Sequence, residues 1–194
     1  MEYSIKEGKL LIQLARDAIR SFFTGALMAF EPYKKDFSHQ QGVFVTLFKD
    51  GFLRGSIGYP QSKYPLYRAV FYAARGAAFE DSRFAPLTQK EAESIEIEIG
   101  LISEPHVLTI KEPKEYLKKI HVGEDGLLME GVYGKCALLP QVALDNKWGI
   151  KEFLSAVCTE AGLQPDAWQD LKNKFYTFTV QTFMDKNGKI VEKN

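Results

Sequence analysis

Apolar and polar residues alternate along this chain in two rhythms, one with the period of a helix and one with the period of a strand. Over residues 4–24, apolar side chains recur every three or four positions, which is the spacing of one helix face. Ser4 and Glu7 form a capping box at the start of this stretch and Gly25 follows it, so we predict an amphipathic helix there. Four further helices are predicted: residues 65–79, a short helix that begins with a second capping box of Thr88 and Glu91, residues 113–120 and residues 148–161.

Strand-like segments come mostly in pairs separated by turn residues. "GVFVTLF" and "FLRGSIG" are rich in β-branched and aromatic residues and are joined through Asp50 and Gly51, a pair typical of a hairpin turn. "GLLMEGVYGKCALLP" predicts a second hairpin that turns near residues 131–134. Two single alternating strands are predicted as well: "SIEIEIGLIS", and "KFYTFTVQTFM" with its end near the Asn187-Gly188 turn.

The order of these elements indicates the fold class. Helices and strands do not alternate one for one, and hairpins provide most of the strand pairing, so a parallel doubly wound sheet is excluded. We therefore predict an α+β fold with mainly antiparallel sheets flanked by helices. The chain has 194 residues without an internal repeat or a Pro/Ser-rich linker, and we treat residues 1–194 as a single domain.

Charge and cysteine content narrow the function classes. The chain carries 25 basic and 25 acidic residues, and this balance makes nucleic acid an unlikely partner because no overall positive field holds a polyanion. No apolar run is long enough to cross a bilayer, so we expect no membrane partner. The two cysteines, Cys136 and Cys158, lack C-x-x-C spacing, and the N-terminus lacks a signal-peptide pattern, so we expect a cytoplasmic location.

The return strand of the first hairpin holds the sharpest candidate for chemistry. Gly55 lies directly before Ser56 and Gly58 lies close behind it, so that the hydroxyl and the backbone are open to a ligand. The spacing is not the G-x-S-x-G of a nucleophile elbow and no partner base is evident, which leaves Ser56 only a candidate catalytic residue. The alternative is structural: the glycines permit close packing and the serine is a small polar filler.

Arg54 is expected on the same strand face as Ser56, because side chains repeat every second residue. A guanidinium beside a hydroxyl would bind a carboxylate or phosphate group. The alternative is a structural ion pair with an acid such as Asp81.

A basic and aromatic stripe is expected on the helix that follows. Arg68, Tyr72, Arg75 and Phe79 fall on one face of the predicted helix 65–79. Such a stripe suits an anionic or planar ligand, or a single nucleic-acid strand, although it is more commonly a solvated face. Metal binding has little support, because the three histidines have no metal-ligand spacing, and we predict no metal site. The sequence does not identify a cofactor.

Several long segments together resemble the AMMECR domain family, in particular "GVFVTLFKDGFLRGSIGYP", "PLYRAVFYAARGAAFEDSRFAPLTQKE", "IEIEIGLISEP" and "GLLMEGVYGKCALLPQVALDNKWGIKEFLSAVCTEAGLQPDAW". The resemblance runs from the first helix to about Trp168 and is to proteins such as the A component of the AmmeMemoRadiSam system. It implies a larger lobe that holds both termini, a smaller inserted lobe and a cleft between them. It also implies radical SAM and Memo-like proteins as partners in a three-component system. The family's usual signature has a cysteine at the position of Ser56 and often a lysine at that of Glu160, so this chain departs from it twice.

The resemblance also marks Asp81, Arg83, Gln141 and Trp148, which fall on family positions. From the residues alone, Asp81 and Arg83 favour a structural brace after a helix end, whereas Gln141 and Trp148 could line a cleft or anchor a helix. We therefore expect a component of a modification system that binds a small anionic or polar ligand at "LRGSIG". The alternatives are a non-catalytic adaptor for a partner protein and, more weakly, a nucleic-acid binder.

Overall fold

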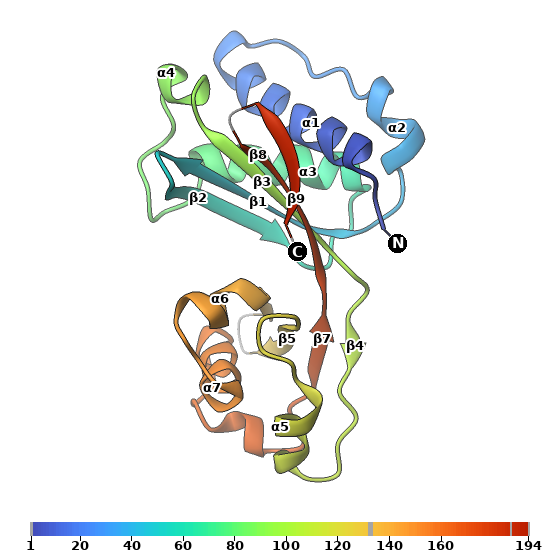
Figure 1. The fold of residues 1–194 in the computed structure, drawn as a ribbon, viewed down its shortest axis with the longest axis vertical. Helices are drawn as coiled ribbons and strands as arrows, with labels where there is room; N and C mark the ends of the chain where they lie inside the picture. Colours follow the sequence, from blue (N-terminus) through green and yellow to red (C-terminus); the bar gives the residue numbers. More distant parts are fainter. Residues whose placement is uncertain (1, 132–133, 187, 194) are drawn as a thin grey trace. The chain divides into compact units, whose positions relative to one another are not determined.

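The computed structural model describes residues 2–131, 134–186 and 188–193. Its contacts divide the chain into two compact units. The first contains the residues up to Ile102 together with those from Gln181 onward, and the second is Ser103–Val180, an insertion in the sequence of the first. Each unit has one open, mainly antiparallel sheet with helices packed on it, which confirms the α+β class (Figure 1).

The first unit contains a five-stranded sheet with strand order β2-β1-β3-β8-β9. Its strands are β1 (Gly42–Lys49), β2 (Phe52–Tyr59), β3 (Glu96–Ile102), β8 (Val180–Lys186) and β9 (Lys189–Lys193). Its helices are α1 (Ile5–Thr24), α2 (Glu31–Phe37), α3 (Leu66–Phe79) and α4 (Gln89–Ala92). The predicted capping boxes at the starts of α1 and α4 are both present.

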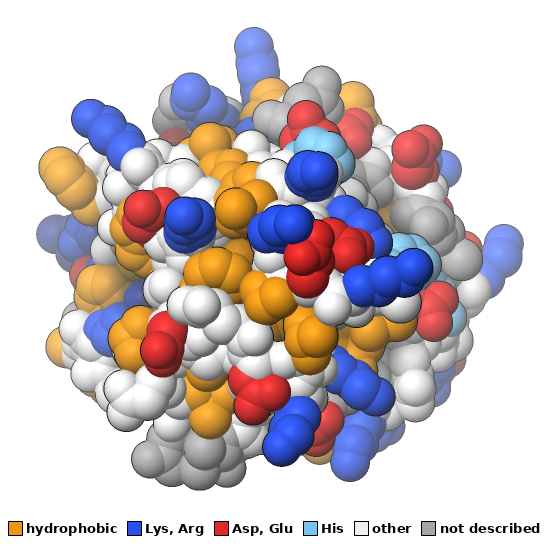
Figure 2. Space-filling view, turned by 90° about the horizontal axis from the view of Figure 1, so that it is seen from below, with side chains coloured by type: hydrophobic (Ala, Val, Ile, Leu, Met, Phe, Trp, Pro, Cys, Tyr) orange, Lys and Arg blue, Asp and Glu red, His pale blue; other side chains and the backbone are white. Residues whose placement is uncertain are grey.

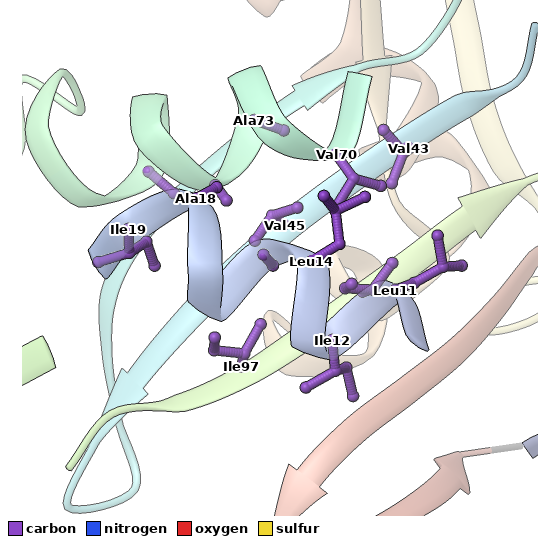
Figure 3. Close-up of a cluster of buried hydrophobic side chains, with 14 of the residues drawn as sticks. Leu11, Ile12, Leu14, Ala18, Ile19, Val43, Val45, Val70, Ala73 and Ile97 are labelled. Carbon is purple, nitrogen blue, oxygen red and sulfur yellow. The ribbon is translucent and has the colours of Figure 1, made fainter. Parts of the chain in front are cut away.

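The core of this unit lies between the sheet and the helix pair α1 and α3. Alanines on the inner side of α3, such as Ala73, let this helix lie close to both α1 and the sheet. The strands contribute alternate residues to the same layer because successive side chains point to opposite faces. Figure 3 shows the interlocked side chains from four elements: Leu11, Ile12, Leu14, Ala18, Ile19, Val43, Val45, Val70, Ala73 and Ile97.

The β1–β2 hairpin has the predicted turn and one irregularity. Asp50 and Gly51 both have positive φ values, 52° and 79°, as a type I′ turn requires. The pairing register shifts after Leu47, which lies opposite Gly55, while Phe48 lies opposite Leu53. One extra residue of β2, Arg54, is therefore accommodated as a β-bulge.

The second unit contains a four-stranded sheet with strand order β4-β7-β5-β6. Its strands are β4 (His106–Val107), β5 (Gly126–Gly131), β6 (Gly134–Leu138) and β7 (Phe175–Phe178). Its helices are α5 (Tyr116–Lys119), α6 (Pro140–Asp145) and α7 (Ile150–Glu160), with short 3-10 turns at Pro113–Glu115 and Ala167–Gln169. The inner side of α7 packs its apolar residues into a separate core around Phe153 and Phe175.

Some expected boundaries are wrong. The alternation in "KFYTFTVQTFM" does not form one strand: β7 pairs in the second sheet, whereas β8 belongs to the first. The break falls at Thr179, where the Ser103 amide donates to the Thr179 carbonyl and the Thr179 amide donates to the Ser103 hydroxyl, both at 2.9 Å. Helices α2 and α6 and strands β4 and β9 were not expected from the pattern. The turn residues 132, 133 and 187 of the two other predicted turns lie outside the described residues.

Charged side chains of both signs share the surface. On the face shown in Figure 2, acidic and basic groups are interspersed, and hydrophobic side chains are exposed between them. This agrees with the even balance of the sequence, 25 basic and 25 acidic residues. Among the described residues, every helix is too short or too polar to span a bilayer.

The close contact between β2 and α3 depends on Gly55. A Cβ atom built at Gly55 would lie 2.0 Å from the backbone carbonyl oxygen of Ala77, and a backbone atom cannot move aside as a side chain can. We expect Gly55→Ala to lower the free energy of unfolding by at least about 3 kcal/mol, measured by chemical denaturation. Gly149→Ala is the control, because a Cβ there meets only the flexible end of Glu152. Equal stability of the two variants would contradict the close contact.

Candidate functional site

The backbone of Ser56 is held from the outer side of the sheet by a loop. β2 is the edge strand, and the outward N–H of Ser56 donates to Oδ2 of Asp81 at 2.8 Å. The Ser56 carbonyl accepts a longer hydrogen bond, 3.4 Å, from Nη2 of Arg83. Both partners follow the end of α3, so the contact of α3 with Gly55 brings them to the strand.

Asp81 and Arg83 form a bidentate ion pair. Nε of Arg83 donates to Oδ1 of Asp81 at 2.9 Å and Nη2 donates to Oδ2 at 2.7 Å. The Arg83 amide also donates to Oδ1. Hydrogen bonds from Arg83, and then those from the backbone amides of Ser56 and Arg83, hold the pKa of the Asp81 carboxyl far below its ordinary value despite burial. These hydrogen bonds confirm the expected structural brace, and the group that they hold in place is the Ser56 backbone.

The side chain of Ser56 lies on the sheet face opposite α3. Gly55 and Ile57 face the helix, as the near contacts at Ala77 and Gly76 show. Ser56 lies across from Thr46 of β1, and the two hydroxyl oxygens are 2.8 Å apart. One hydroxyl donates to the other, so the pair keeps one hydrogen available for a further acceptor. Thr46 in turn lies across from Glu98 of β3.

Aromatic rings flank the hydroxyl pair along β1. Phe44 and Phe48, two residues to either side of Thr46, share its face and are half-buried. Gly58 is required here, because a Cβ at this position would lie 2.2 Å from the Phe44 ring. The Phe44 ring therefore lies over Gly58 of β2, and the residue across from Phe44 in β3 is also a glycine, Gly100.

Arg54 does not stand beside Ser56 as expected. The bulge breaks the two-residue alternation, and the guanidinium binds Glu91 instead, with Nε at 3.2 Å from Oε1 and Nη2 at 3.4 Å from Oε2. Nη1 donates to the carbonyl of Ala85 at 2.9 Å, and the Arg54 side chain is only 16% exposed. Arg54 is thus in an ion pair, but with Glu91 rather than with Asp81, and a ligand anion would have to displace this carboxylate.

Glu91 serves two structures at once. It completes the capping box of α4 with Thr88, and its Oε1 also accepts from Nζ of Lys49 at 3.1 Å. The hydrogen bonds from Thr88 and Arg54 outweigh desolvation and hold the pKa of Glu91 far below its ordinary value. Lys49 and Arg54 are therefore tied to the start of α4.

The remaining candidates lie elsewhere in the fold. Arg68 is on the exposed face of α3. Gln141 and Trp148 belong to the second unit, where Gln141 donates to Asp145 within α6 and Trp148 packs on the core around Phe153. Among these candidates, hydrogen bonds join Ser56, Asp81 and Arg83; Gly55 and Gly58 lie beside Ser56 in β2, and Arg54 binds Glu91 instead.

The two cysteines and the side chain types that ligate metal ions are further candidates for a site in the fold. Burial raises the pKa of the Cys136 thiol, and it raises that of Cys158 to about 11, so both remain protonated at neutral pH. The described residues contain no group of three or more His, Cys, Asp or Glu side chains placed to hold a metal ion.

Comparison with known proteins gives consistent results. The AMMECR1 family model matches residues 12–183.

The chain belongs to the AMMECR1 family.

Two relatives and one solved structure are similar to this chain over more than nine-tenths of each chain. Protein MJ0810 of Methanocaldococcus jannaschii is 37% identical over 194 residues, covering 98% of this chain and 96% of that protein. A protein of Methanothermobacter thermautotrophicus is 40% identical over 179 residues, with 91% and 93% covered. The crystal structure of the uncharacterised protein PH0010 of Pyrococcus horikoshii matches with a TM-score of 0.89 and 36% identity, with 97% of each chain covered.

Two residues of this AMMECR1-family site were not foreseen from the sequence. Thr46 was missed because the expected hairpin register, without a bulge, does not place it across from Ser56. Glu91 was expected only as a capping residue. Its ion pair with Arg54 could have been suspected, because an arginine in a glycine-rich strand needs an acidic partner and Glu91 belongs to a predicted capping box. The strand register places Thr46 at the site, and the packing of α4 places Glu91 there.

We expect Arg54→Ala to destabilise this AMMECR1-family protein. The substitution removes a half-buried ion pair and a backbone hydrogen bond and leaves Glu91 with one cation fewer. The free energy of unfolding should fall by about 2 kcal/mol and the melting temperature by about 5 °C. Arg20→Ala, an exposed arginine of α1, should change either value little. An unchanged melting temperature for Arg54→Ala would show that the pair does not stabilise the fold.

The stability added by the Asp81 carboxylate should depend on pH. Its folded pKa is depressed, so its contribution is complete above the unfolded pKa of about 4 and declines as the pH falls below that value. Asp81→Asn should cost about 2 kcal/mol at neutral pH, and the difference from the wild type should shrink by about 1 kcal/mol towards pH 3. Urea denaturation of both proteins at each pH measures this. A difference that grows on acidification would contradict the assigned role.

Proposed function

We propose that this AMMECR1-family protein is the binding component of a modification system that also contains a radical SAM protein and a Memo-like protein. Its ligand is a small polar molecule held on the sheet face around Ser56 and Thr46. The single observation that carries this proposal is the hydroxyl pair of these two residues, 2.8 Å apart, between the half-buried rings of Phe44 and Phe48. Family membership supports the link to the modification system.

The surroundings favour binding over catalysis by Ser56. Its hydroxyl lies against a second hydroxyl, and a serine nucleophile needs a base in that position. Asp81, the carboxylate bonded to the Ser56 backbone, accepts four hydrogen bonds and has a strongly lowered pKa. A carboxylate of such low pKa is a weak base and gives little proton-transfer catalysis near neutral pH.

The charges around the site favour a neutral polar ligand over a strongly anionic one. Arg83 is matched by Asp81, and Arg54 by Glu91. A free guanidinium would attract a phosphate or carboxylate group, whereas a paired one has to give up its partner first. A hydroxyl pair with one hydrogen to donate, flanked by aromatic rings, suits a ligand with a polar acceptor and a flat apolar part.

Native mass spectrometry of protein purified from its own host tests this proposal. The wild type should retain a small molecule, and Ser56→Ala or Thr46→Val should lower its occupancy about tenfold, because either change breaks the hydroxyl pair and the remaining hydroxyl is no longer oriented by its partner. Ser56→Ala keeps the backbone hydrogen bonds to Asp81 and Arg83, so folding is preserved.

Ser38→Ala, an exposed hydroxyl at the end of α2, is the matched control and should retain the ligand. A wild-type protein that carries no additional mass, or a Ser56→Ala variant that carries as much as the wild type, would refute the proposed site. Equal melting temperatures of the variants would confirm that occupancy, and not folding, has changed.

A further inference from the structure

The outer face of α3 presents arginines and aromatic rings to solvent. The α3 face consists of Arg68, Tyr72, Arg75 and Phe79, joined at its two ends by Tyr64 and by Phe22 of α1. Three of these rings are unusually open for large apolar groups: Phe22 is 48%, Tyr64 44% and Tyr72 39% exposed. Exposed aromatic residues together with arginine are the composition of protein-binding hot spots.

The guanidinium of Arg75 is fixed between two rings. Its Cζ lies 5.2 Å from the centre of the Phe22 ring and 5.5 Å from that of Phe71. Stacking uses the flat faces of the guanidinium and leaves the N–H groups at its edges. The N–H groups of Arg75 make no hydrogen bond to another described residue, and no buried polar side-chain atom there lacks a partner, so these donors point to solvent.

Positive charge on the α3 face is not balanced by acids of the same unit. Among the described residues, neither Arg68 nor Arg75 forms an ion pair, in contrast to Arg16, Arg54 and Arg83. Lys34 of α2 lies near enough to Arg68 for the like charges to repel, and the neighbouring acid Glu31 already pairs with Lys34. Glu80, which directly follows Phe79 in the sequence, is exposed.

The rings form two contacting groups, and the Arg75 guanidinium lies between them against Phe22 and Phe71. Tyr64 and Tyr72 lie 5.0 Å apart, Phe71 and Tyr72 5.3 Å, and Phe22 stacks on Phe79 at 3.9 Å. Side chains held in this way lose little further freedom when a partner binds, which favours affinity.

We propose that the α3 face binds an acidic, aromatic-containing segment of a partner protein. Arg68 and Arg75 are seven residues apart on one helix, so their Cα atoms are separated by about 10 Å along the axis. Two carboxylates four residues apart in an extended segment point to the same side and lie about 13 Å apart, a spacing that the two long arginine side chains can span. An apolar or aromatic side chain between them lies over Tyr72.

Charge complementarity favours such a segment over a nucleic-acid strand. A single strand is held by a continuous basic groove, and the α3 face offers two unpaired arginines on a chain without net charge. Carboxylates at defined positions, by contrast, need only two guanidinium groups of fixed orientation.

Fluorescence anisotropy with a labelled glutamate–tyrosine copolymer tests the proposal. The full chain should bind this probe saturably, and Arg68→Gln combined with Arg75→Gln should weaken binding about tenfold or more, because both carboxylate partners are lost. Arg75→Lys keeps the charge but loses the planar fork, so it should weaken binding severalfold. Arg20→Gln removes an exposed arginine outside the α3 face and should leave the affinity within about twofold.

Three outcomes would overturn the proposal: no saturable binding of the copolymer by the wild type, equal losses for Arg20→Gln and the double variant, or tighter binding of labelled oligothymidylate than of the copolymer. Thermal unfolding followed by circular dichroism shows whether each variant is folded. If the double variant is not, Arg75→Lys carries the comparison. None of these substitutions touches Ser56 or Thr46, so the result does not depend on the small-ligand site.

Discussion

The contact of Gly55 with the carbonyl of Ala77 is the constraint on which the first unit depends. It fixes the distance between β2 and α3 at a value that no residue with a Cβ permits. With α3 at this distance, the residues after its end reach the outer backbone of the strand, and Asp81 and Arg83 meet Ser56. The bulge at Arg54 directly before Gly55 sends the neighbouring guanidinium to Glu91. One small residue thus determines the partners of the whole signature "LRGSIG".

The polar residues in and around the signature therefore divide into two classes. Arg54 binds Glu91 at the start of α4, and Arg83 binds both Asp81 and the Ser56 carbonyl. These contacts hold the hairpin, the α3 end and the start of α4 together. Ser56 alone presents a side chain to the other face of the sheet, where Thr46 is its neighbour. The surface suited to a polar ligand is accordingly the hydroxyl pair, and the surplus of positive charge lies on α3, at Arg68 and Arg75.

The sequence was sufficient for elements whose signal is local. The α1 capping box, the Asp50-Gly51 turn and the inward residues of β3 follow from propensity and period alone. Pro32 concealed α2, because a proline that interrupts a pattern is also tolerated in the first turn of a helix. The division at Thr179 between β7 and β8 could not be foreseen, since alternation shows that one face is buried but not in which sheet. The bulge at Arg54 has no periodic signature, so its ion pair with Glu91 and the pairing of Ser56 with Thr46 could not be derived from spacing.

The position of Asp81 and Arg83 against Ser56 has a consequence for how molecules of this protein meet in solution. An outermost strand normally exposes a row of backbone donors and acceptors that a strand from a second molecule can pair with, which leads to aggregation. In β2 the backbone N–H and carbonyl of Ser56 are hydrogen-bonded to the Asp81 carboxylate and the Arg83 guanidinium. These two groups take the place of a neighbouring strand at this position. The same ion pair that braces the hairpin therefore opposes strand addition at the β2 edge of the five-stranded sheet.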